Sequence, residues 1–252
     1  MARFIYIYLF VILIPFNSFS QDNHDFKNFL KVGGDVYTAP FHFDNKDVLT
    51  LSLSTATIIG AYFLDEPIRD LFQRNKGNVG DAIFSVDKYA IEGATVAIAG
   101  VYIYGLVADD NTTRNLGLRL IEAYAFSELS NYVIKVLSGR SRPFNNLGHD
   151  QFNPVQFDFD NTSFPSGHTA MGFSVGKVMA DYSKTIAWKV TWYAFGALMG
   201  TARIYNDRHW LSDVVAGGLL SYFISDFVDN HYTNKNVQLG TTGMNFSLKV
   251  IL

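Results

Sequence analysis

Cysteine is absent from this chain of 252 residues, and its absence excludes several kinds of chemistry. Disulfide bonds, thiolate metal ligands, a cysteine nucleophile and a lipid-modified cysteine all need a residue that the chain lacks. Charged residues are also scarce, at 17% of the chain, and the net charge is −3. Proteins that bind nucleic acid carry a basic stripe, so this charge balance argues against nucleic acid as a partner.

Apolar residues are correspondingly abundant. Hydrophobic residues make up 48% of the chain and aromatic residues 15%. This composition lies at the apolar end of soluble proteins and overlaps with membrane proteins of modest hydropathy. At this length the chain can form one large domain with a substantial buried core.

The N-terminus has the pattern of a secretory signal. A short basic start precedes the apolar run Phe4–Phe16. Small residues at Ser18 and Ser20 then occupy the −3 and −1 positions for a cleavage after residue 20. The apolar run is shorter than the ~20 residues that cross a bilayer, which favours a cleaved signal over an uncleaved anchor. We therefore expect export to the cell envelope, in the periplasm or associated with a membrane.

Six segments have helical patterns of apolar residues. They are Val48–Leu64, Ala90–Ala108, Leu116–Leu137, Gly167–Tyr182, Ile186–Tyr205 and Leu211–Val228. The segment Asn145–Ser163 is too polar and irregular for a core element, and strand-like alternation is confined to Asn245–Leu252. The sequence predicts an all-α fold, a helical bundle of about six main helices.

The same patterns divide the chain into four parts. We expect a signal peptide at 1–20 and an N-terminal arm at 21–47, in which a short amphipathic helix precedes an irregular stretch. A helical domain then covers 48–233, and a loose tail follows at 234–252.

Membrane spans are predicted less clearly than helices. Val48–Leu64 and Ala90–Ala108 are long and apolar enough to cross a bilayer. The later helices contain charges such as Lys177 and Asp226, which are costly at bilayer depth. A helix that is apolar on all sides also occurs at the centre of soluble bundles. The balance of these features favours membrane embedding or association.

The first chemical motif is the pair Lys135 and Arg142, followed by Pro143. Seven residues correspond to about two helical turns, so both cations can reach one point. Arginine offers a planar fork for two oxygens of an oxyanion, whereas lysine offers a point charge. Taken alone, the motif favours a different interpretation, a basic helix end that interacts with its own dipole.

The second motif is Pro165-Ser166-Gly167-His168, immediately before a helical pattern. Ser166 is a good N-cap, and the free backbone N–H groups that follow it form a natural site for an anion. Gly167 allows close approach of a ligand, and His168 is placed to donate a proton to a leaving oxygen. The alternative is an ordinary capped helix with a histidine on its surface.

The third motif joins Arg203, His209 and Asp213. His209 and Asp213 are four residues apart and share a helix face. A carboxylate that accepts a hydrogen bond from one imidazole nitrogen leaves the other nitrogen as a nucleophile. The alternative is the polar face of a helix that enters solvent.

Together the motifs bring three cations and one carboxylate into an apolar background. Unpaired charge in a protein interior is very costly, and one aspartate does not balance a lysine and two arginines. The motifs therefore predict a cradle for a multiply charged oxyanion, with phosphate as the leading candidate.

In order and spacing, the three segments resemble the signature motifs K-x6-RP, PSGH and SR-x5-H-x3-D. These motifs are typical of the type 2 phosphatidic acid phosphatase (PAP2)/vanadium haloperoxidase superfamily, and the resemblance covers Lys135 to Asp213. One departure is Ala202, which stands where the third motif usually has serine. The missing hydroxyl makes the site less polar near Arg203 but does not change the roles that the resemblance implies for the motif residues.

The resemblance implies a helical fold of the PAP2/haloperoxidase type and a two-step phosphoryl transfer without a metal or other cofactor. The implied phosphate-binding residues are Lys135, Arg142, Ser166, Gly167 and Arg203. His209 would form a phosphohistidine, oriented by Asp213, while His168 would protonate the leaving alcohol.

Three functions remain open from the sequence. The first is an envelope phosphatase whose substrate is a phosphorylated lipid. The second is a soluble secreted acid phosphatase acting on small phosphate esters. The third is a haloperoxidase in which vanadate is the cofactor and His209 its ligand. His149 and Asp150 are more typical of a solvated loop than of a site, and no feature indicates a protein partner or an oligomeric state.

Overall fold

A computed structural model describes residues 22–235, 237–242 and 245–250. The predicted signal segment at 1–20 lies outside these residues. The N-terminal half contains α2 (Asp22–Thr38), η2 (Ala39–His42), α3 (Asn45–Tyr62), α4 (Asp65–Arg74), α5 (Asn78–Phe84), η3 (Ser85–Tyr89) and α6 (Ala90–Val107). The C-terminal half contains α7 (Asn111–Ser138), η4 (Pro143–Asn145), α8 (Gly167–Tyr182), α9 (Ile186–Tyr205), α10 (Leu211–Lys235), β1 (Val237–Thr242) and β2 (Asn245–Val250).

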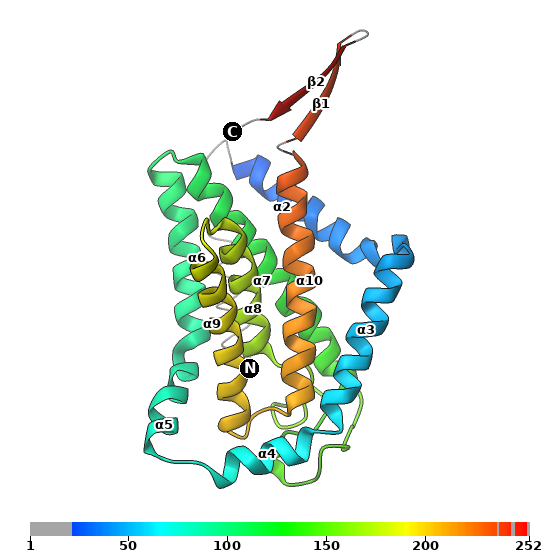
Figure 1. The fold of residues 1–252 in the computed structure, drawn as a ribbon, viewed down its shortest axis with the longest axis vertical. Coiled ribbons are helices and arrows are strands. Elements are labelled where there is room, and N and C mark those ends of the chain that lie inside the picture. Colours follow the sequence, from blue (N-terminus) through cyan, green and yellow to red (C-terminus); the bar gives the residue numbers. More distant parts are fainter. Residues whose placement is uncertain (1–21, 236, 243–244, 251–252) are drawn as a thin grey trace.

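Helices α6 to α10 run side by side as a bundle, and α3 stands beside α10 at its edge (Figure 1). All six predicted helical segments are present, so the prediction of an all-α bundle of about six main helices is confirmed. The strand-like alternation near the C-terminus falls on β2, which pairs antiparallel with β1 beyond the end of α10, in the part of the chain that we expected to be a loose tail.

Local sequence signals explain where the main helices begin and end. Asp44 caps α3, because its carboxylate accepts from the backbone N–H of Lys46 and of Asp47 at 2.7 and 2.9 Å. Asp110 caps α7 in the same way. Helix α7 ends at Gly139, whose φ of 57° lies in the left-handed region that glycine adopts without strain. That turn directs the chain into the loop that carries Arg142.

Two apolar clusters form the core. One lies between α6, α7, α8 and α9 and includes the fully buried Met171 and Met199. The other joins α2 to the bundle, where Val32 and Val36 pack with Phe126 of α7. The N-terminal helix is thus longer than the short helix expected in the arm, and its apolar face is buried against the bundle. The predicted boundary between arm and domain at 47–48 stays a prediction.

Much of the outer surface is apolar. Among the residues that the structure describes, two helical stretches, Asn78–Val107 and Leu211–Tyr232, are long and apolar enough to cross a membrane. A third arises if α3 and α4, which meet at an angle of 51°, form one broken span. Large apolar side chains such as Leu53 and Val96 are exposed on these helices. Such a surface indicates association with a membrane.

Candidate active site

The three sequence motifs meet at one end of the bundle. Helices α7 and α9 end there, and α8 and α10 begin there, close to α4 at the bottom of Figure 1. Lys135 lies in the last turn of α7 and Arg203 in the last turn of α9. His168 is the second residue of α8, and His209 precedes α10 by two residues. The bundle thus assembles segments that are up to 78 residues apart in the sequence (Lys135 to Asp213).

His209 and Asp213 face one another in the interior. The imidazole Nδ1 of His209 lies 3.5 Å from Asp213 Oδ2, and both side chains are almost fully buried. The hydroxyl of Ser163 donates to the same carboxylate oxygen at 2.6 Å and lies 3.4 Å from His209 Nδ1. The backbone N–H of Trp210 also donates to Asp213 Oδ2, at 2.8 Å. Asp213 is therefore fixed on the Nδ1 side of His209.

The other imidazole nitrogen faces the cations. His209 Nε2 lies 3.1 Å from Arg142 Nη1, which is always a donor. Nε2 must then accept, so the proton of the neutral ring is on Nδ1, towards Asp213. Burial, followed by the charge of Arg142, lowers the pKa of His209 well below its ordinary value of about 6.5. The ring is held in the neutral form that a nucleophile requires.

Lys135 and Arg142 converge as the seven-residue spacing predicts. Both donate to the backbone carbonyl of Thr162, from Lys135 Nζ at 3.2 Å and from Arg142 Nη2 at 3.3 Å. Lys135 Nζ also donates to the carbonyls of Ser163 and Pro165. Burial, followed by the charge of Arg203, lowers the pKa of Arg142 to about 9, which is the response of a cation that lacks a full complement of anions.

Ser166 occupies the N-cap position of α8, but its side chain does not cap the helix. Its Oγ accepts instead from the hydroxyl of Thr169 at 2.9 Å, and both residues are fully buried. The predicted capping bond is therefore wrong, although the position is right. The backbone of Ser166 packs closely against Gly217 of α10. A Cβ at position 217 would lie 2.4 Å from the Ser166 carbonyl oxygen, so this close approach requires glycine.

Arg203 has a partner that the motifs do not reveal. Its Nη1 lies 2.5 Å from Oδ2 of Asp87, a buried residue of η3. The backbone carbonyl of Asp87 also accepts a hydrogen bond from His168. Burial, followed by the charges of Arg203 and Lys135, lowers the pKa of the half-buried His168 well below its ordinary value. Asp87 thus touches two of the three motifs.

The expected excess of positive charge is smaller than the sequence indicates. Arg203 forms an ion pair with Asp87, which neutralises one of the three cations. Asp213 forms an ion pair with Arg140 at 2.6 Å, so its negative charge is shared between Arg140 and the phosphate cradle. Lys135 and Arg142 have no carboxylate within 4.0 Å among the described residues. These two cations and the neutral His209 leave the cluster suited to an incoming anion.

Two hollows adjoin this cluster. A polar hollow of about 370 Å³ opens beside Arg203. Its lining is Asp81, Ser85, Asp87, Lys88, Arg203, Asn206 and Arg208. The hollow gives a polar ligand access to Arg203 from the side of η3.

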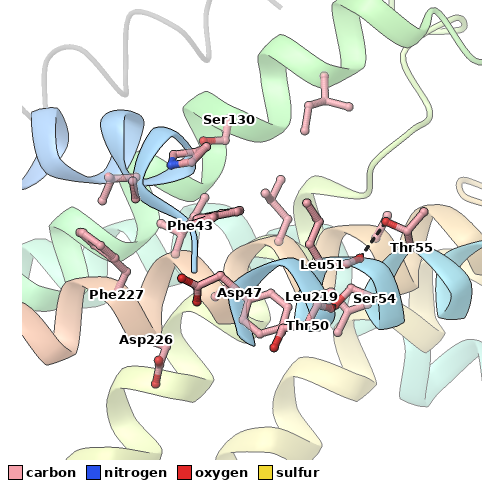
Figure 2. A pocket seen from close by; sticks show the side chains of 18 of the residues that line it. Phe43, Asp47, Thr50, Leu51, Ser54, Thr55, Ser130, Leu219, Asp226 and Phe227 are labelled. Carbon is pink, nitrogen blue, oxygen red and sulfur yellow. Dashed lines mark hydrogen bonds between the residues drawn. The ribbon is translucent and has the colours of Figure 1, made fainter. Parts of the chain in front are cut away.

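An apolar groove of about 780 Å³ lies between α3 and α10. Figure 2 shows that α3 contributes Leu51 and Ser54 and that α10 contributes Leu219 and Phe227. The hydroxyls of α3 do not make the groove polar, because Ser54 and Thr55 donate to carbonyls of their own helix. Phe164 and Pro165, directly before Ser166, also line the groove.

The match to a family model agrees with this arrangement. The model of the PAP2 superfamily matches residues 116–235, which contain all eight predicted site residues. Over this segment, which is just under half of its length, the chain matches the PAP2 superfamily. The matched segment begins within α7, so the helices before it and the residue Asp87 are not part of the match.

Similarity to individual PAP2 proteins is partial. The chain is 37% identical to the lipid A 1-phosphatase of Porphyromonas gingivalis over 86 residues, 31% of this chain and 19% of that protein. It is 30% identical to the undecaprenyl-diphosphatase of Sulfolobus acidocaldarius over 114 residues, 45% of this chain and 53% of that protein. The chain thus spans about half or less of these relatives.

The fold is similar to that of a protein of known structure. The crystal structure of LpxE from Aquifex aeolicus superposes with a TM-score of 0.53 and 22% identity. The superposition covers 66% of this chain and 95% of that chain. This likeness shows a shared helical fold.

Replacement of Asp87 by asparagine is expected to strengthen binding of inorganic phosphate. The carboxylate competes with an anion for Arg203, whereas a neutral amide of the same shape does not. We expect the inhibition constant of phosphate to fall about fivefold, equivalent to ~1 kcal/mol for a partly buried ion pair. Asn206→Ala, which removes hydrogen bonds to Asp87 and to the backbone carbonyl of Phe84 but leaves the carboxylate charge in place, is the control. Weaker phosphate inhibition in Asp87→Asn would contradict the prediction.

Proposed function

We propose that this protein is a metal-independent phosphatase of the cell envelope, which hydrolyses a phosphate monoester or diphosphate of a lipid. The observation that carries the proposal is the setting of His209. One ring nitrogen faces Asp213, and the other faces the guanidinium of Arg142. A neutral imidazole held in this way beside a cationic cradle is suited to attack phosphorus.

In the first step, Nε2 of His209 attacks phosphorus, and the bond from phosphorus to the ester oxygen breaks. His168 in its protonated form gives its proton to the leaving oxygen. Lys135, Arg142 and Arg203 stabilise the charge on the phosphoryl oxygens, as the backbone N–H groups at the start of α8 do. Asp213 stabilises the positive charge that develops on the imidazole.

In the second step, water attacks the phosphohistidine. His168, now neutral, accepts the proton of the water, and the phosphorus–nitrogen bond breaks. The products are inorganic phosphate, a neutral His209 and a protonated His168. The protons and charges thus return to their initial arrangement after one turnover.

We propose that no metal takes part, because side chains supply the positive charge. The described residues contain no group of three or more histidine, aspartate or glutamate side chains that could hold a metal ion. The cations Lys135, Arg142 and Arg203 would also repel a divalent metal at the position of the phosphate.

The apolar groove supports a lipid as substrate. Its volume of about 780 Å³ is within the range of ligand sites, and it lies between helices with exposed apolar surfaces. Pro165 lines the groove, while its backbone carbonyl accepts from Lys135 in the cradle. One lipid molecule could therefore place its hydrocarbon chain in the groove and its phosphate at the cradle. The names of two relatives, a lipid A phosphatase and an undecaprenyl-diphosphatase, are consistent with this substrate class.

The function is tested by hydrolysis of p-nitrophenyl phosphate and of a short-chain phosphatidate in detergent. We expect release of phosphate that persists in EDTA and is inhibited by orthovanadate, which mimics the transferring phosphoryl group. Activity that requires a divalent metal would contradict the mechanism. Oxidation of bromide by peroxide with vanadate, in the absence of ester hydrolysis, would favour the haloperoxidase.

A bulky residue in the groove is expected to discriminate against long lipid chains. Ser54→Trp should raise KM for a long-chain phosphatidate by roughly tenfold, because about two buried methylene groups at ~0.8 kcal/mol each are lost. The KM for p-nitrophenyl phosphate should not change, because this ester has no lipid chain. Leu53→Trp, on the exposed side of the same helix, is the matched control. An equal change in KM for both substrates would show that the groove does not hold the substrate chain.

A further inference from the structure

Arg140 lies within the loop of the first motif but does not join the phosphate cradle. Its side chain is fully buried. Nη1 donates to Asp213 Oδ1 at 2.6 Å and to Ser212 Oγ at 2.7 Å. Nη2 donates to Asp65 Oδ2 at 2.6 Å and to the backbone carbonyl of His149 at 2.7 Å, and Nε donates to that carbonyl at 3.0 Å. All five N–H groups of the guanidinium are therefore used.

Asp65 is the second carboxylate bound to Arg140, on Nη2, whereas Asp213 is bound to Nη1. It is fully buried at the start of α4, and its carboxylate accepts from both the backbone N–H and the hydroxyl of Ser212, at 2.8 and 2.7 Å. Asp65 and Ser212 thus hold Arg140 and the first turn of α10 together. Residues from α4, the loop after α7 and α10 form one connected polar network.

The two oxygens of Asp213 have separate partners. Oδ1 accepts from Arg140, whereas Oδ2 accepts from Ser163 and faces His209. A carboxylate bound only through Oδ2 could rotate away from the imidazole. The bond to Oδ1 fixes the rotation of the carboxylate and supplies a positive charge that keeps it ionised.

Aromatic rings enclose the guanidinium. Its central carbon lies 5.3, 5.2 and 5.6 Å from the ring centres of Tyr62, Phe152 and Trp210. These rings exclude water and favour a flat cation. Lysine at this position would keep the charge but would not reproduce the five directed hydrogen bonds.

We propose that Arg140, held by Asp65, is a positioning residue that fixes Asp213 and through it the tautomer and orientation of the nucleophile His209. This role rests on the proposed function of His209. Arg140 acts through Asp213 and does not touch the substrate. Its loss should therefore impair the chemical step while phosphate binding by Lys135 and Arg142 is retained.

The variants Arg140→Gln, Arg140→Lys and Asp65→Asn test this proposal. We expect kcat to fall on the order of 100-fold in Arg140→Gln, as is usual when a group that orients a catalytic residue is lost. KM should stay within about threefold of the wild type, since the cradle is intact. Arg140→Lys should recover only part of kcat, and Asp65→Asn should show a smaller loss of the same kind.

Two further measurements separate positioning from a merely structural role. The acid limb of the pH profile should move to higher pH in Arg140→Gln, because the His209–Asp213 pair takes up a proton more readily once the nearby guanidinium charge is lost. In ¹⁵N-histidine NMR spectra, the wild type should show His209 protonated on Nδ1, and Arg140→Gln should show a mixture of tautomers. This spectrum does not depend on turnover and can be compared with that of Asp65→Asn.

Arg114→Gln is the matched control. It removes a buried ion pair with Asp25 at 2.6 Å, at the opposite end of α7. If Arg140→Gln and Asp65→Asn change only the melting temperature, as Arg114→Gln should, the positioning role is overturned while the phosphatase function stands. A wild type that hydrolyses no phosphate ester, tested in parallel, would instead overturn the function on which the role rests.

Discussion

Replacement of His209 by alanine is expected to reduce hydrolysis of phosphate esters by at least about 10⁴-fold, the usual order for loss of a nucleophile. The structure gives the physical reason, because Asp213 orients the ring of His209 through Nδ1 while Nε2 faces Arg142. Wild-type enzyme quenched during turnover of a ³²P-labelled ester should carry an acid-labile phosphoryl group. The His209→Ala enzyme should carry none.

Binding without turnover is the control for this variant. Lys135, Arg142 and Arg203 are unchanged in His209→Ala, so the dissociation constant of inorganic phosphate should stay within a few-fold of the wild type. His24→Ala, exposed at the start of α2 and outside the lining of the groove, should retain full activity. A labelled phosphoenzyme in His209→Ala would show that another residue is the nucleophile.

The fold was largely predictable because its helices are marked locally. The predicted limits of α8 and α9, Gly167–Tyr182 and Ile186–Tyr205, coincide with the structure. Pro165 stands before the first of these helices, and Thr185 caps the second through the N–H of Trp188. Apolar periodicity then fixes which faces are buried. The signal at 1–20 is a local pattern too, but it lies outside the described residues and stays a prediction.

The motif residues were predictable for a different reason. Each motif is a short stretch whose spacing is set by a helix end or by one helical turn, so its members are neighbours in both sequence and space. The structure brings Lys135, Arg142, His168, Arg203 and His209 together at one end of the bundle. Their chemical roles stay predictions until the variants are measured.

The partners of these residues were not predictable, because they depend on tertiary contacts. Asp87 is 116 residues from Arg203, and Asp65 is 75 residues from Arg140, with no spacing rule that connects them. The hydroxyl of Ser166 gives a second example, since its fully buried position favours Thr169 over the expected helix cap. Sequence patterns thus predicted the cationic residues of the cradle but not the carboxylates, Asp87 and Asp65, that form ion pairs with the arginines.

The protonation of His168 is expected to depend on whether substrate is bound. In the free enzyme, burial and the charges of Arg203 and Lys135 lower the pKa of His168 well below 6.5, so the ring is neutral at pH 7. A bound phosphate ester offsets those charges and favours the protonated ring, so binding should take up a proton. The profile of kcat should therefore fall on the alkaline side as His168 in the complex loses its proton. The profile of kcat/KM should fall only on the far acid side, well below pH 6.5, because burial and the charge of Arg142 lower the pKa of His209 in the free enzyme.

His168→Ala separates these two limbs. Its kcat for an alkyl phosphate should fall by about 10²–10⁴-fold, because the leaving alkoxide is no longer protonated, and the alkaline limb should disappear. With p-nitrophenyl phosphate the first step needs no acid, whereas the second step still lacks the base that activates water. The variant should thus release one equivalent of p-nitrophenolate in a burst and then turn over slowly while the phosphohistidine accumulates. Equal losses of kcat for both esters, with no burst and an unchanged alkaline limb, would assign the proton transfer to another group. The acid limb, which we assign to His209, would not be affected by that outcome.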